Sequence, residues 1–149
     1  MSLMDAFKIS EQGMDTQSAR LNVHAVNIAN VHTPGYVRKI PVLSETNAQS
    51  FEEILSKIRN QGVIQGGLAY RPAGVEMSGV LHDSTPAKKI YRPGHPYADK
   101  DGYVTLSNTN ILGDMADAMV SSRMYEAQLS VFGITKAMAN RAIELGRGQ

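Results

Sequence analysis

The run NIANVHTPGY, residues 27–36, most constrains the fold of this chain because it closes a long helical pattern with a Pro-Gly pair. Pro34 disfavours the α conformation at Thr33, the residue before it. Pro34 and Gly35 together suit the two central positions of a type II turn. The sequence therefore predicts one N-terminal helix over residues 1–31, ended by a built-in turn.

One face of this predicted helix carries a heptad-like stripe that advances by alternate steps of four and three residues. Its members are Leu3, Phe7, Ser10, Met14, Gln17, Leu21, His24 and Ile28. Three of the eight, Ser10, Gln17 and His24, are polar or ionisable, and they share the d-type position of the heptad. A coiled coil needs apolar side chains there, so the stripe makes a weak coiled-coil seam. An isolated helix of this length needs a packing partner, and we expect that partner at the other end of the chain.

A second proline-free segment, residues 108–149, predicts a C-terminal helix that pairs with residues 1–31. Asn108 or Asn110 can cap its start. Asp114 follows near the positive end of the helix dipole, where a carboxylate is stabilising. These two long helices are expected to pair as an antiparallel coiled coil.

The last helix is apolar on two faces. The 120–145 stripe consists of Val120, Met124, Ala127, Val131, Ile134, Met138, Arg141 and Leu145; the 115–143 stripe consists of Met115, Ala118, Tyr125, Leu129, Phe132, Ala139 and Ile143. A helix that is apolar over most of its circumference is normally buried on several sides. We expect other protein subunits to cover it. For Met124 and Met138 we favour ordinary core packing, with an adaptable subunit interface as the alternative.

The middle region, residues 32–107, holds all six prolines and reads as irregular and β-rich. Alternating and β-branched patterns predict strands over residues 36–43, 75–81, 88–91 and 103–106. A capping-box pattern predicts one short helix over residues 51–59, inside a variable insertion at 44–73. The expected fold class is therefore α+β, with two long terminal helices and a small β-rich middle.

Composition excludes several classes of function. The formal net charge is +1, from 15 basic and 14 acidic side chains, which argues against nucleic acid or an anionic membrane as the main partner. There is no cysteine, so disulfides, thiolate metal sites and a cysteine nucleophile are excluded. We expect no cleaved secretory signal, because no apolar h-region follows the first residues, and no run is apolar enough to span a membrane.

Five residues of the middle region could be imagined as a metal site, and all of them except Asp83 as the centre of a metal-dependent hydrolase. They are His82, Asp83, His95, Asp99 and Asp101. Their spacing fits no helix-borne ligand pair, and turn residues between strands are the favoured interpretation. No phosphate loop, dinucleotide fingerprint or nucleophile motif is present. The sequence therefore predicts no enzyme, no cofactor, no metal, no catalytic residue and no small-molecule substrate.

Two terminal motifs carry a family likeness. Residues 17–21 (QSARL), 27–30 (NIAN) and 33–36 (TPGY) closely resemble the N-terminal signature of bacterial flagellar rod and hook proteins. Residues 123–127 (RMYEA) resemble the matching C-terminal signature. The resemblance implies an axial protein of the flagellum whose terminal helices pair and stack into a helical tube.

The middle narrows this resemblance to the proximal rod branch of the axial family. The matching motifs are VLHD at 80–83, YRPGHP at 91–96, AD at 98–99, GYV at 102–104 and Asn108. Asp114-Met115 stands where the family usually has Glu-Met, and Gln128 where it usually has Asn. Residues 44–73 match nothing in the family pattern.

The resemblance implies a structural subunit of the rod, which spans the periplasm and transmits motor torque to the distal rod and hook. It implies self-association in a helical rod, contacts with other proximal rod proteins, the MS-ring/rod adaptor and the distal rod protein, and passage through the flagellar type III export apparatus. The two stripes suggest eight subunit-interface residues: Leu21, Asn27, Ile28, Asn30, Met124, Tyr125, Val131 and Phe132. The alternatives are another axial subunit, a metal-dependent hydrolase and a free-standing coiled-coil adaptor.

Overall fold

A computed structural model describes residues 3–46 and 73–147 of the chain. The described elements, in chain order, are helix α1 (Leu3–Ala29), strands β1 (Lys39–Glu45), β2 (Val75–His82), β3 (Lys89–Tyr91) and β4 (Tyr103–Thr105), and helix α3 (Ile111–Arg147). Two long helices in contact stand before and after the short strands in the chain, so the predicted α+β class is confirmed. The predicted short helix at 51–59 lies outside the described residues.

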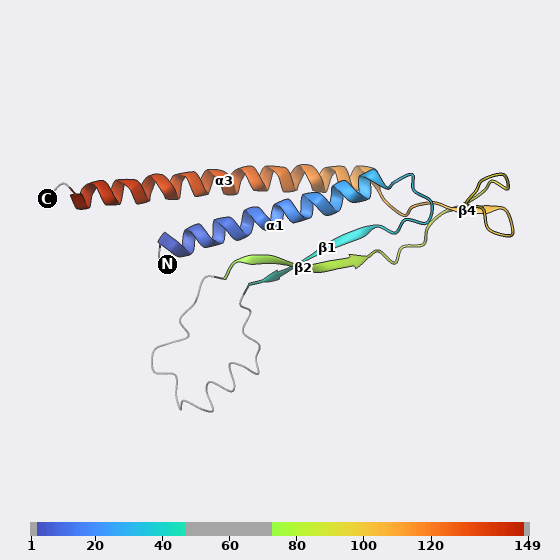
Figure 1. Ribbon diagram of the computed structural model, residues 1–149, viewed down its shortest axis with the longest axis horizontal. Helices are drawn as coiled ribbons and strands as arrows, with labels where there is room; N and C mark the ends of the chain where they lie inside the picture. Colours follow the sequence, from blue (N-terminus) through green and yellow to red (C-terminus); the bar gives the residue numbers. More distant parts are fainter. Residues whose placement is uncertain (1–2, 47–72, 148–149) are drawn as a thin grey trace, which may run out of the picture.

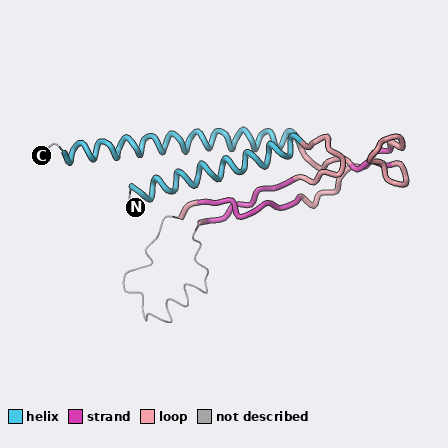
Figure 2. Tube along the Cα trace, viewed as in Figure 1, coloured by secondary structure: helices cyan, strands magenta, loops and turns pink. Residues whose placement is uncertain are grey.

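The molecule is elongated, with the two helices side by side and antiparallel (Figure 1). α1 lies between α3 and the β1–β2 sheet, and it contacts both. α3 is the longer helix and continues past the start of α1, whereas the β3–β4 hairpin lies at the opposite end from both termini (Figures 1 and 2). Neither described helix combines the length and apolar character that a membrane crossing requires.

The turn that ends α1 has the geometry that its sequence predicts. The amide of Asn30 donates to the carbonyl of Val26 at 3.2 Å, which closes the last turn of the helix. Gly35 has a φ of +73°, the left-handed value that the third position of a type II turn requires. The Tyr36 amide donates to the Thr33 carbonyl at 3.2 Å and closes that turn. The Pro-Gly helix stop is therefore confirmed.

The strands form two antiparallel sheets of two strands each, β1–β2 and β3–β4. β1 and β2 pair from Lys39 opposite His82 to Glu45 opposite Val75, with an irregularity after Val42. The first sheet is tied to α1 by the Thr16 hydroxyl, which donates to the Val75 carbonyl at 2.8 Å. β1 begins at Lys39, three residues later than the predicted strand. Ahead of it, the Tyr36 amide closes the Pro-Gly turn and the Arg38 amide donates to the Asn108 side chain.

The apolar core of the single chain is very small. Among residues 3–46 and 73–147, the buried apolar side chains are Val23, 9% exposed, and Val104, 2% exposed. The core packing favoured for the 120–145 stripe is wrong for the single chain, because Met124 is 52% exposed and Met138 is 60% exposed. α1 is too narrow to cover both apolar faces of α3. The stripe therefore lies on the open side of the helix pair.

Candidate functional site

A buried carboxylate lies where the two helices meet the β region. Asp114 is on the first turn of α3, which begins with the Asn110 side chain accepting a hydrogen bond from the Gly113 amide at 3.3 Å. This settles the N-cap in favour of Asn110. Asp114 is fully buried. A buried carboxylate is tolerated only when its oxygens receive hydrogen bonds.

Three side chains from two other segments supply those bonds. His24 donates from Nδ1 to Oδ1 of Asp114 at 2.8 Å, and Asn27 donates from Nδ2 to the same oxygen at 3.1 Å. Arg38 donates from Nε to Oδ2 at 2.9 Å and from Nη2 to Oδ1 at 3.2 Å. We call these four residues the polar cluster. It joins α1, α3 and the segment that leads into β1.

Asn27 uses its whole amide group. Besides donating to Asp114, its Nδ2 donates to the Lys39 carbonyl at 2.7 Å, and its Oδ1 accepts from the Lys39 amide at 2.9 Å. The same Oδ1 accepts from the Tyr36 hydroxyl at 3.0 Å. The side chain thus pairs with the backbone of Lys39 as a neighbouring strand would. This arrangement fixes the start of β1 on the last turns of α1.

Asn108 fixes the other side of the same segment. Its Oδ1 accepts from the Arg38 amide at 2.7 Å, and its Nδ2 donates to the carbonyls of Asp83 and Thr85. The Arg38 guanidinium also lies 3.6 Å from the carboxylate of Asp83 and 3.8 Å from that of Asp117. Asn108 therefore does not cap α3; it connects the end of β2 to the cluster.

The polar cluster shifts the pKa values of Asp114, Arg38 and the neighbouring Tyr36. Burial alone would raise the pKa of Asp114, but hydrogen bonds from Arg38, His24 and Asn27 outweigh it, so the pKa lies below its ordinary value. The bond to Asp114 is also the main cause that raises the pKa of Arg38. Burial, and then the negative charge of Asp114, raise the pKa of Tyr36. The carboxylate and the guanidinium are therefore both charged at neutral pH.

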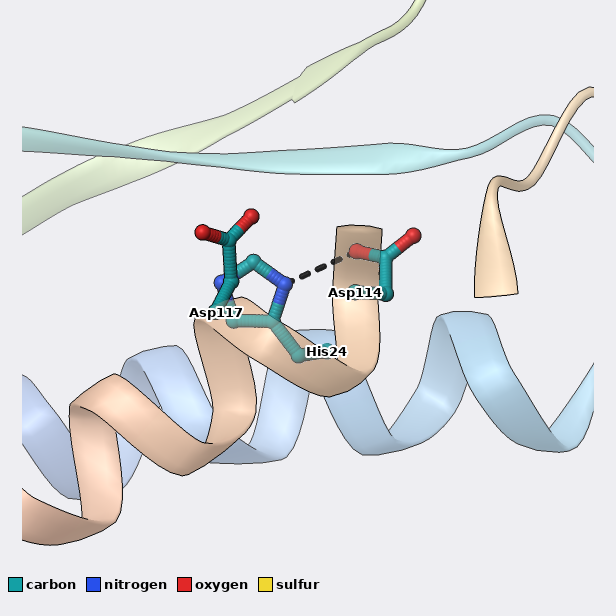
Figure 3. A group of neighbouring side chains, drawn as sticks. All are labelled: His24, Asp114 and Asp117. Atoms are coloured by element: carbon teal, nitrogen blue, oxygen red, sulfur yellow. Dashed lines mark hydrogen bonds and ion pairs between the residues drawn. The ribbon is translucent and has the colours of Figure 1, made fainter. Parts of the chain in front are cut away.

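His24, Asp114 and Asp117 also form a group whose ligand atoms lie within 4.8 Å of one another (Figure 3). Both oxygens of Asp114 already accept hydrogen bonds, and Nδ1 of His24 carries the proton that it donates. Nε2 of His24 is buried and has no partner among the described residues, so it and the Asp117 carboxylate are the remaining ligand atoms. Two ligands beside a guanidinium make a poor cation site.

The imagined metal site of the middle region is not assembled. His82, Asp83, His95, Asp99 and Asp101 form no metal-binding group in the described part of the chain. Asp83 accepts hydrogen bonds from Thr85. Asp99 accepts from the amides of Asp101 and Tyr103 at 3.1 and 2.8 Å. The interpretation as turn residues is confirmed for these two aspartates.

The eight predicted interface residues fall into two groups. Exposed residues are Leu21, Met124, Tyr125 and Val131, and half-buried ones at the end of α1 are Ile28 and Asn30. The remaining two act inside the subunit. Asn27 is fully buried in the cluster, and Phe132 packs edge-to-face on Phe7 with ring centroids 5.1 Å apart. Asn27 therefore makes its hydrogen bond to Asp114 across the contact between the two helices of one chain.

Sequence reasoning missed Arg38 and the partnership of His24 with Asp114. The available signal was His24 itself, an ionisable residue at a seam position of the predicted helix. A buried histidine needs a hydrogen-bond partner. The chain has 14 acidic residues, and nothing in the sequence identifies Asp114 among them as the partner of His24.

Comparisons with known proteins identify the family. Residues 7–36 match the family model described as flagella basal body rod protein. The chain is 32% identical to the flagellar basal-body rod protein FlgC of Salmonella typhimurium, over 99% of this chain and 100% of the relative. It is 32% identical to FlgC of Escherichia coli O6:H1 with the same coverage, and 30% identical to FlgC of Bacillus subtilis over 99% of this chain and 100% of the relative. The chain therefore belongs to the FlgC family of flagellar basal-body rod proteins.

Proposed function

We propose that this chain is a subunit of the proximal rod, where it assembles helically and passes motor torque to the distal rod and hook. Family membership makes it a structural rod subunit that assembles with other rod proteins, and not an enzyme. The resemblance of residues 91–104 to the proximal branch supports its place along the rod.

One structural observation carries the proposal: the single chain leaves most of its apolar surface open. Val23 and Val104 are its buried apolar side chains within the described ranges, whereas Met124 and Val131 of the 120–145 stripe are half exposed. Exposed apolar area of this extent marks a protein–protein contact. A stripe that repeats every 3.5 residues fits another helix. The neighbours that cover α3 are therefore helices of adjacent rod subunits.

The eight predicted interface residues have different roles in the proposed contact. Met124, Tyr125 and Val131 on α3 contact the neighbouring helix directly. Leu21, Ile28 and Asn30 on α1 extend the contact surface toward the joint. Asn27 and Phe132 act indirectly, because their side chains hold α1 on α3.

The partners proposed beyond the rod itself are the MS-ring/rod adaptor, the distal rod protein and the flagellar type III export apparatus. The small apolar core supports passage of an unfolded chain, since little stability opposes unfolding. Export without a cleaved signal predicts that the rod-incorporated protein keeps its first residues. Mass spectrometry of purified basal bodies that detects a shortened N-terminus would contradict this route.

A variant that introduces two charges into the 120–145 stripe tests the proposed function. Met124→Asp with Val131→Asp places two carboxylates in the proposed contact, and burying unpaired charge is costly. Expressed in a strain that lacks the native copy, this variant is expected to abolish swimming and to halt rod assembly. The matched control is Ala137→Asp with Asn140→Asp, which adds the same charge to α3 outside the stripe.

The control variant is expected to swim normally. Immunoblots must show equal amounts of both variants, so that degradation does not explain the difference. Normal swimming by the Met124→Asp, Val131→Asp variant would refute the proposed contact. Equal loss of swimming in both variants would show that added charge on α3, and not the stripe, is responsible.

A further inference from the structure

We infer that the β3–β4 hairpin is a second docking surface of this chain, and that its occupant is the side of α1 that carries Glu11 and Asp15 on another copy. The inference rests on the proposed function, because it names a contact between the assembling copies. It is separate from the 120–145 stripe, since the hairpin lies at the opposite end of the molecule from both termini (Figure 1).

One face of the hairpin exposes two aromatic rings beside a cation. Lys89 pairs with Thr105 and Tyr91 pairs with Tyr103, so these four side chains share one face, which we call the hairpin face. Val104 lies on the other face and is buried. Tyr91 is 64% exposed and Tyr103 is 43% exposed, with ring centroids 5.3 Å apart. Exposed tyrosines of this kind are typical of the centres of protein interfaces.

A pocket continues the hairpin face toward the turn that ends α1. Its volume is about 270 Å³, and it is lined by Pro34, Gly35, Tyr97, Ala98, Asp99, Tyr103 and Thr105. The ring of Tyr97 is as open as that of Tyr91, at 70% exposed. A pocket walled by aromatic rings accepts an apolar side chain of a partner and can anchor it.

The hairpin holds this shape by its own hydrogen bonds. The Arg92 amide donates to the Gly102 carbonyl at 2.8 Å, and the Gly102 amide donates to the Asp99 carbonyl at 2.9 Å. The Gly35 amide donates to the Thr105 carbonyl at 3.0 Å, which fixes the hairpin on the turn that ends α1. A surface that is ordered before binding loses little conformational freedom when it docks.

The charge of the hairpin selects an acidic partner. Its exposed basic side chains are Lys88, Lys89, Arg92 and Lys100, and its exposed acidic ones are Asp99 and Asp101. Oδ1 of Asp99 already accepts from the amides of Asp101 and Tyr103. Within residues 3–46 and 73–147 the ion pairs belong to His24 and Arg38, so the four hairpin cations have no anionic partner there.

α1 carries a matching acidic side. Glu11 and Asp15 lie one helical turn apart and are both exposed. Like charges at this spacing repel each other, and neither carboxylate forms an ion pair in the described part of the chain, even with Lys8 one turn before Glu11. α3 and the β1–β2 sheet cover other sides of α1. The acidic side is therefore open to a cationic surface from outside.

A single copy does not bring the two surfaces together. Glu11 and Asp15 lie in the first half of α1, toward the N-terminus, whereas the hairpin lies beyond the other end of α1 (Figures 1 and 2). The contact therefore joins the hairpin of one copy to α1 of the next. A contact between two different surfaces repeats from copy to copy and builds a ring or a helical filament.

Cysteine crosslinking can detect this contact in assembled basal bodies, because the chain has no native cysteine. Ser18→Cys lies one turn beyond Asp15 on α1, Asp101→Cys lies in the loop between β3 and β4, and both positions are exposed. Cells with both substitutions are expected to swim. Their basal bodies, treated with a bismaleimide, are expected to give a covalent dimer of this chain. Chains with either cysteine alone are the controls and are expected to stay monomeric.

Charge reversal tests whether the two surfaces recognise each other. Lys89→Glu with Lys100→Glu, added to the double-cysteine chain, is expected to abolish both the dimer and swimming. Glu11→Lys with Asp15→Lys is expected to do the same. All four reversals together are expected to restore the dimer and swimming, because opposite charges again face each other.

The matched control combines the two hairpin reversals with Glu126→Lys and Glu144→Lys, two exposed positions of α3. It has the net charge of the fourfold variant and is expected to give no dimer. Immunoblots must show equal amounts of all chains. Lys89→Gln with Lys100→Gln introduces no repulsion and is expected to reduce the dimer, so that poor expression of a reversal variant does not decide the result.

An undiminished dimer after hairpin reversal or neutralisation would overturn the inference, as would failure of the fourfold variant to restore it. A crosslink to a different protein would show that the occupant is not a second copy. Swimming cells whose double-cysteine chain gives no dimer would refute the hairpin contact and leave the proposed rod function standing, which the Met124→Asp, Val131→Asp variant tests separately.

Discussion

Asp114 accepts a hydrogen bond from His24 at 2.8 Å across 90 residues of sequence, and it does so fully buried. The bond joins the first turn of the last helix to the end of the first. In a chain whose described part buries so few apolar side chains, this polar contact and its neighbours carry the specific geometry of the joint.

Removing the charge of Asp114 should destabilise the chain strongly. Asp114→Asn leaves the Arg38 guanidinium partly buried without its closest anion, and breaking such a pair costs about 3 kcal/mol. Urea unfolding followed by circular dichroism should show a much lower midpoint. Asp117→Asn should change the unfolding free energy by less than about 1 kcal/mol, because that carboxylate is half exposed. Equal effects of the two substitutions would contradict the central place of Asp114.

Acid should weaken the fold through the same carboxylate. The pKa of Asp114 in the folded chain lies below its ordinary value, so the folded state binds fewer protons than the unfolded state near pH 4. Its stabilisation is therefore fully present above about pH 4 and is lost as the pH falls through the folded-state pKa. Urea midpoints measured from pH 6 to pH 3 should fall less steeply in Asp114→Asn than in the native chain. Parallel curves would assign the acid sensitivity to other carboxylates, such as Asp83, whose pKa is lowered by hydrogen bonds from Thr85 and by Arg38.

The sequence predicted the elements that depend on local signals. The Pro34-Gly35 turn and four strands were readable because backbone preferences and side-chain alternation act over a few residues. Core packing was the favoured interpretation of Met124 and Met138 in the 120–145 stripe, yet both are exposed in the single chain, since periodicity does not say which neighbour covers a face. The pairing of His24 with Asp114 was unreadable, because it depends on how two distant helices slide against each other.

The turn at Gly35 should tolerate no side chain. Its φ of +73° is a left-handed conformation that costs other residues about 1 to 2 kcal/mol. No atom lies within 4 Å of a Cβ built there, so Gly35→Ala tests backbone strain without a clash. Thermal unfolding should show a clear drop in Tm. Gly94→Ala is the control, because Gly94 is equally uncrowded and has no positive φ. A similar drop in both would mean that lost glycine flexibility, and not the turn geometry, is responsible.

The Phe7–Phe132 contact should couple the N-terminal end of α1 to the middle of α3. Their rings meet edge-to-face with centroids 5.1 Å apart, and such pairs add about 0.5 to 1.5 kcal/mol beyond the area they bury. A double-mutant cycle with Phe7→Ala and Phe132→Ala should give a coupling energy in that range from urea unfolding. The matched cycle combines Phe7→Ala with Leu129→Ala, since Leu129 is 53% exposed on the same helix. That cycle should give a coupling near zero. Additive effects for Phe7 with Phe132 would show that the two helices do not meet at this point in solution.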